Sequence, residues 1–329
     1  MSSHETNDSS LSPASGPPPG SARAAVSRGW DRVRDAWPQV LAAYGLSLLL
    51  SLSLAAALQV GLRESLEHRE AAERLLQGWD GLWHASFSTR AEGLEATFDA
   101  GVVGIGAVLR SLDALVQGAL LDLPLPLVVA GLLYLLGWVW LGGGLLARFG
   151  GDRRGVITLG AVHFRRLLSV AAVGWIGWAL VLGSALPMLS RLVEHWCRDV
   201  VDERVHAAWL LGKYALVWSL VLAIRWVVDY AKVIAVADPS CSAGSALREG
   251  LRLCLRRARA VVGIAAILGA IGLALLVLYS FLAPGADQGN PFKILVAFLI
   301  SQTSVVARVV MRAWGLASEQ ALWEAGRGR

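Results

Sequence analysis

Six long apolar runs constrain this chain more than any other feature of its sequence. A helix rises about 1.5 Å per residue, so roughly 20 apolar residues are needed to cross a hydrocarbon core of ~30 Å. That length is reached by the runs at about 40–62, 125–147, 167–189, 207–232, 261–283 and 292–312. The sequence therefore predicts an all-α fold, a polytopic transmembrane helical bundle of six spans within a membrane domain at 38–325.

The first 37 residues have a different composition. They begin "MSSHETNDSSLSPASGPPPGSAR", which is rich in Ser, Pro and Gly and has little apolar surface to bury. We expect residues 1–37 to form a disordered cytoplasmic tail. The first span could instead be read as a cleaved signal peptide, but such a peptide has an apolar region of only about 7–15 residues. The longer run at 40–62 favours an uncleaved anchor.

Cations in the loops predict the orientation of the bundle, because Arg and Lys accumulate on the cytoplasmic side of membrane proteins. The loop after the second span and the loop after the fourth are both rich in arginine, and residues 63–123 between the first two spans are richer in acids. We therefore expect both termini to be cytoplasmic, in a multi-pass protein of a bacterial plasma (inner) membrane.

The segment "FDAGVVGIGAVLRSLDALVQGALLDL", residues 98–123, complicates this count. If it crossed the membrane it would bury Arg110 and Asp113, at about 2.5–3.5 kcal/mol each. It would also place the later arginine-rich loops outside. We expect an amphipathic helix on the outer surface, between the first and second spans, or one packed against the bundle.

Charged residues inside two spans are the candidate functional residues. Residues three, four and seven apart share a helix face. The fourth span thus presents Arg225, Asp229 and Lys232 on one stripe. The last span presents another stripe, which contains Ser301, Ser304, Arg308, Arg312, Gly315 and Glu319. Ionisable residues in spans face the bundle interior and pair there. We call Arg225, Asp229, Lys232, Arg308 and Arg312 the polar seam, which serves either as a structural salt-bridge cluster or as a solute site.

A second basic feature is "SALREGLRLCLRRARA", residues 245–260. One face of the predicted helix carries four arginines, and another carries leucines and Cys254. Each cation near anionic lipid contributes about 1 kcal/mol of attraction. The inner leaflet is therefore the expected partner of Arg248, Arg252, Arg256 and Arg259.

The sequence supplies no pattern for catalysis, for a cofactor or for a metal. The stretch "EHWCRDVVDE", 194–203, brings His, Cys and acids together, but a solvated helix explains it as well as a zinc site that needs three or four convergent ligands. Nucleic-acid binding would need a basic surface with motif support, which is not visible. The expected partners are membrane lipids, with protein partners or a homo-oligomer also open.

Two stretches carry a resemblance to other proteins. With "DYAKVIAVADPSCSAGSALREGLRLCLRR" and "SQTSVVARVVMRAWGLASEQALW", the chain resembles a group of uncharacterised six-span bacterial membrane proteins. That group is distantly similar to the membrane domain of some glycerophosphodiester phosphodiesterases. The resemblance implies a helical membrane module of unknown activity, without phosphodiesterase chemistry.

Three functions remain open from the sequence. The favoured one is a non-catalytic membrane module that acts through helix packing with partners or lipid. The second is a permease or transporter component for an anionic solute, which would use the polar seam. The third and least favoured is a lipid-modifying membrane enzyme, which lacks a candidate nucleophile and base.

Overall fold

The computed structural model describes residues 20–66, 72–75, 78–99, 105–117, 124–200, 202–283 and 290–327, and these residues form helices joined by turns. The predicted all-α fold is confirmed. The elements in chain order are α1 (Ala22–Asp35), α2 (Trp37–Ser65), α4 (Gly81–Ser88), η1 (Glu95–Thr97), α5 (Ile105–Gln117), α6 (Leu125–Phe149), α7 (Val156–Leu180), η4 (Val181–Ala185), α8 (Leu186–Cys197), α9 (Glu203–Ala237), α10 (Ala243–Arg256), α11 (Ala258–Leu282) and α12 (Pro291–Arg327).

The predicted number of candidate spans, six, is also confirmed. Within the described ranges, six helical stretches are long and apolar enough to cross a membrane: α2, α6, α7 continued through η4 into α8, α9, α11 and α12. Many large apolar side chains on them are exposed, such as Leu49 and Phe281. In water such exposure would be unfavourable, whereas hydrocarbon solvates these side chains. The outer faces of the six helices thus suit contact with lipid.

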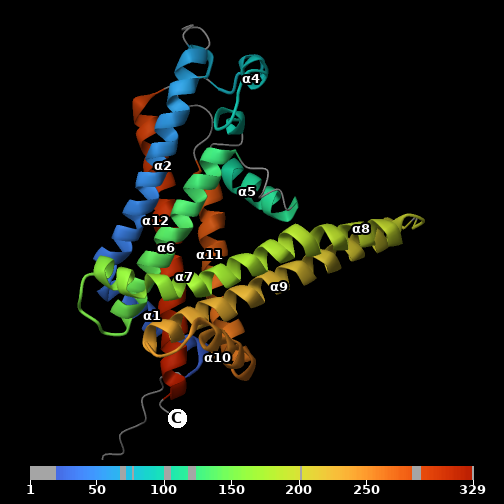
Figure 1. Ribbon diagram of the computed structural model, residues 1–329. Coiled ribbons are helices and arrows are strands. Elements are labelled where there is room, and N and C mark those ends of the chain that lie inside the picture. Colours follow the sequence, from blue (N-terminus) through green and yellow to red (C-terminus); the bar gives the residue numbers. More distant parts are fainter. Residues whose placement is uncertain are drawn as a thin grey trace, which may run out of the picture.

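The spans are arranged in two groups (Figure 1). In this view α2, α6, α11 and α12 run in roughly the same direction. The antiparallel pair formed by α7–α8 and α9, yellow-green and gold, leans away from them. α1 and α10 lie near the C-terminal end of α12, whereas α4 and α5 lie near the opposite end. The two groups therefore diverge from the α1 and α10 end.

Small residues allow α7 to pack close to α6 at the end from which the two helix groups diverge. A methyl group at Gly144 would lie 2.2 Å from the carbonyl oxygen of Val156, and one at Gly160 would lie 2.5 Å from the carbonyl oxygen of Trp140. Both distances are below van der Waals contact. In lipid, where helices gain no hydrophobic drive to associate, such close backbone approach is what packs them.

An arginine of α7 fixes the C-terminal end of α9. The guanidinium of Arg166 donates hydrogen bonds to the backbone carbonyl oxygens of Ala235, at 2.9 Å, of Asp238, at 3.2 Å, and of Pro239. The last carbonyls of a helix lack partners within the helix, so a cation there supplies both hydrogen bonds and a favourable charge. Arg166 thereby joins the two helices of the leaning pair.

The structure corrects the expected disordered tail at 1–37. Residues 1–19 lie outside the described residues, but α1 occupies most of the remainder and packs against α12 and α11. Arg32 forms an ion pair with Glu324, and the indole nitrogen of Trp314 donates to the carbonyl oxygen of Val26 at 2.8 Å. The apolar face that includes Val26 and Val33 is buried, and this burial offsets the entropy of ordering the segment.

The expected amphipathic helix between the first two spans corresponds to α5. It has 13 residues, about 20 Å of helix, which is less than a hydrocarbon core requires. Arg110 on this helix forms an ion pair with Asp99 at 2.5 Å. The flanking parts of the 98–121 helix, at 100–104 and 118–121, lie outside the described residues. The outer-surface position of α5 stays a prediction.

Thiol labelling tests the orientation of the bundle. Cys197 is buried and therefore cannot report on it, but Arg198 beside it is exposed. We expect Arg198→Cys to react with an impermeant thiol reagent on intact cells, and Cys241 to react only after permeabilisation. Burial raises the pKa of the Cys254 thiol to about 12, helped by the charges of Glu319 and Asp229. Cys254 should therefore stay protonated and unlabelled. The unsubstituted chain is the control, and the reverse pattern of labelling would refute cytoplasmic termini.

Candidate functional site

The charged stripe of α9 is compensated largely within its own helix. The Asp229 carboxylate accepts a hydrogen bond from the Lys232 ammonium group at 2.8 Å, and Arg225 Nε lies 3.5 Å from its other oxygen. The Asp229 side chain is 14% exposed, whereas that of Arg225 is 55% exposed. The spacings i, i+3 and i, i+4 bring these groups together. Asp229 is thus the centre of the stripe, and Arg225 stays more than half exposed while it is paired with Asp229.

Arg312 on α12 is held by aromatic rings of α6. Its guanidinium carbon lies 4.1 Å from the ring centroid of Trp138 and 6.0 Å from that of Tyr134. Such cation–π contacts are strongest where water is excluded, and Trp138 is buried. The two rings fix the position of the cation without neutralising its charge, so Arg312 retains its capacity to attract an anion.

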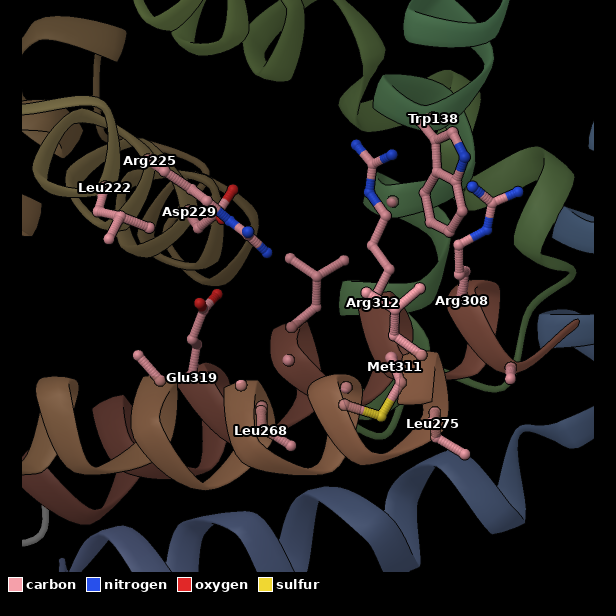
Figure 2. A pocket seen from close by; sticks show the side chains of 18 of the residues that line it. Trp138, Leu222, Arg225, Asp229, Leu268, Leu275, Arg308, Met311, Arg312 and Glu319 are labelled. Atoms are coloured by element: carbon pink, nitrogen blue, oxygen red, sulfur yellow. The ribbon is translucent and has the colours of Figure 1, made fainter. Parts of the chain in front are cut away.

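The structure brings the charged stripes of α9 and α12 together around one cavity. Arg225, Asp229, Lys232, Arg308 and Arg312 all line it. Figure 2 shows Arg225 and Arg312 directed toward the same space from α9 and α12, with Glu319 directed toward Arg225. Arg308 lies on the other side of Trp138, so Arg312 is the α12 cation that interacts electrostatically with Asp229.

The cavity has a volume of about 1690 Å³ and is bounded by six helices: α5, α6, α7, α9, α11 and α12. On α12 its charged lining lies between Arg308 and Glu319. Nearer the start of α12 the lining includes Leu299 and Ile300, followed by the hydroxyl residues Ser301, Thr303 and Ser304, and the facing part of α11 supplies mainly apolar side chains up to Leu282. The cavity is therefore polar in one half and largely apolar in the other.

The charged half of the cavity is electropositive. Four cations (Arg225, Lys232, Arg308 and Arg312) and two acids, Asp229 and Glu319, line the cavity, which gives it a formal excess of at least two positive charges. With apolar walls nearby, this charge is weakly screened and attracts anions. The arrangement can bind and orient an anionic group.

No family model, curated protein or solved structure matches this chain.

Several buried polar atoms of the cavity lack partners among the described residues. They are Glu319 Oε2, the Tyr230 hydroxyl and Trp138 Nε1, and all three residues line the cavity. Buried polar groups are nearly always hydrogen-bonded, to protein, water or a ligand. A group bound in the cavity would satisfy those of them that it reaches. No three of the described His, Cys, Asp and Glu residues, however, lie close enough together to hold a metal ion.

Several of these residues were not among the candidates from sequence. Glu319 stood on the predicted stripe of the last span, but its isolation from a donor depends on how α9 and α12 face each other. The signal for Tyr134 and Trp138 is their i, i+4 spacing in an otherwise aliphatic span. Nothing in the sequence indicates that this aromatic pair meets Arg312.

The basic helix at 245–260 divides into two helices. α10 ends at Arg256 and α11 begins at Ala258, so Arg248, Arg252 and Arg256 lie on α10, whereas Arg259 lies on α11. The four arginines are exposed. Through Gly250, α10 packs closely on α9, which keeps this basic face attached to the helix of the polar seam.

Proposed function

We propose that the protein is a non-catalytic membrane module that binds, in this cavity, a membrane lipid with an anionic head group. The proposal also places the protein in a bacterial inner membrane with both termini on the cytoplasmic side. It retains the resemblance to the membrane domain of glycerophosphodiester phosphodiesterases. The observation that carries it is the division of one large cavity into an electropositive half and an apolar half.

The size of the cavity supports a lipid more than a small solute. Pockets for small ligands usually measure about 300–1,000 Å³, and this cavity, at about 1690 Å³, is larger. The apolar part suits acyl chains, which gain free energy by leaving water. A free anion would use the charged half and leave the apolar half without a function.

The orientation of the cavity also matches a lipid of the inner leaflet. Its charged half lies on the part of α12 nearer the C-terminus, the end that we expect to be cytoplasmic. The apolar half extends along α11 and α12 toward the opposite side. A lipid bound with its phosphate among the cations would therefore keep the direction that it has in the leaflet.

Lipid titration monitored by native mass spectrometry tests the proposal. We expect the detergent-purified protein to retain phosphatidylglycerol, and Arg312→Ala to weaken retention about tenfold, the effect of losing one hydrogen bond to a charged group. Arg252→Ala is the matched comparison: it removes an equal charge from the exposed face of α10, where we expect contact with the leaflet outside the cavity, so it should weaken retention much less. The melting midpoint of each variant establishes that it is folded.

Two outcomes would contradict lipid binding in the cavity. Equal losses from Arg312→Ala and Arg252→Ala would indicate general attraction of lipid to basic surface. Arg312-dependent release of inorganic phosphate across a proteoliposome membrane would instead favour the permease function.

A further inference from the structure

Glu319 is the second acid that lines the cavity, and among the described residues one of its carboxylate oxygens lacks the donors that Asp229 has. Asp229 is bound by Lys232 and Arg225 from its own helix. The Oε2 atom of Glu319 is buried and receives no hydrogen bond from the described residues. Figure 2 shows this carboxylate reaching from α12 toward α9, beneath Arg225. The cavity therefore contains a carboxylate oxygen that the described residues leave for another group to bind.

The surroundings of Glu319 favour a donor that arrives together with an anion. Burial disfavours the charged form of Glu319, and Asp229 repels its charge, whereas Arg225 and Lys232 attract it. The carboxylate of Asp229 already takes part of the attraction of both cations, so an anion alone would increase the negative charge around Glu319. A head group that carries both a phosphate and a donor would satisfy the cations and the carboxylate at the same time.

We infer that Glu319 accepts a hydrogen bond from the head group of the bound lipid, which is a phosphodiester that carries its own hydroxyl or ammonium donor. This inference rests on the proposed function. The phosphate is bound by Arg225 and Arg312, and a short carbon chain places the donor at Glu319. The cations give affinity for phosphate, whereas Glu319 gives selectivity among phospholipids, because an acceptor left without its donor penalises lipids that lack one.

Two pairs of lipids, each matched in charge, isolate the donor. Phosphatidylglycerol and phosphatidylmethanol are both anionic, but only the first has head-group hydroxyls. Phosphatidylethanolamine and phosphatidylcholine are both zwitterionic, but only the first can donate from nitrogen. The two lipids of each pair compete for the purified full chain, and native mass spectrometry measures how much of each is bound. We expect the donor-bearing lipid to be preferred about tenfold in at least one pair.

Variants then assign the preference to Glu319. Glu319→Ala should bring the ratio of the two bound lipids close to one. Arg312→Ala should weaken the binding of both lipids of a pair and leave their ratio unchanged. Glu319→Gln distinguishes the two donors. The amide oxygen still accepts from a hydroxyl, so a preference for phosphatidylglycerol should largely persist, whereas a preference for the ammonium group should be lost with the charge.

Failure of the inference can be told from failure of the proposed function. Equal retention of both members of each pair, still weakened by Arg312→Ala, would overturn the role of Glu319 and leave lipid binding intact. A preference unchanged in Glu319→Ala would overturn it as well. Absence of retained lipid in the unsubstituted protein would overturn the proposed function itself.

Discussion

Asp229→Ala is expected to lower the stability of the protein in detergent by about 3–5 kcal/mol, the cost of removing one partner of a buried ion pair. The Asp229 side chain is 14% exposed and lies against Lys232 and Arg225. Without it, these cations and Arg312 repel one another in a weakly screened space. Equilibrium unfolding or the melting midpoint in mild detergent measures the loss.

Arg225→Ala is the matched comparison and should cost much less, about 1 kcal/mol or below, because its side chain is 55% exposed. Adding Lys232→Ala to Asp229→Ala should restore part of the stability, since the uncompensated ammonium group is then absent. Equal losses from Asp229→Ala and Arg225→Ala, together with a loss in the Asp229/Lys232 double variant equal to the sum of the losses from Asp229→Ala and Lys232→Ala, would show that the groups are not coupled.

A loss of about 3 kcal/mol is expected from Arg166→Ala. Three carbonyl oxygens at the end of α9 accept hydrogen bonds from this guanidinium. A hydrogen bond to a charged group contributes about 1.5–3 kcal/mol, but in the variant water would bind the carbonyls and offset part of the total loss. Arg166→Lys should recover a minority of the loss, because an ammonium group cannot reach three acceptors with the geometry of a guanidinium. Thermal unfolding in detergent is the measurement.

Arg165→Ala provides the control for this prediction. Arg165 is the exposed neighbour and carries the same charge, so its removal should change stability by about 0.5 kcal/mol or less. Comparable losses from the two substitutions would show that Arg166 acts through general charge and not through the carbonyls of α9.

The number and type of the spans could be predicted from the sequence because length and hydropathy in a membrane leave few other solutions. α1 was missed for a related reason: its apolar face is narrow and lies among arginines, so composition alone resembles that of a tail. The division at Arg257 was missed as well. Arginine is a good helix former, and the backbone there breaks because α10 packs on α9 while α11 packs on α12.

The candidate site was predicted in its residues but not in its geometry. Helical periodicity placed Arg225 and Asp229 on one stripe and Arg308 and Arg312 on another. Periodicity gives no information on how two helices rotate against each other, so it could not indicate that Arg312 faces Asp229 while Arg308 lies beyond Trp138. The cavity depends on the divergence of two helix groups, which is a tertiary property.

The contact between α1 and α12 has a consequence for biogenesis. The ion pair of Arg32 with Glu324 joins residues 292 positions apart, so the ribosome must make nearly the whole protein before α1 can dock. α12 has 37 residues, about 55 Å of helix, and its last turns supply the surface that α1 covers. Until that surface emerges, the apolar face of α1 is covered only in part, by α11. A chain truncated before about residue 314 would thus display the rest of this face permanently, a feature that quality-control proteases can recognise.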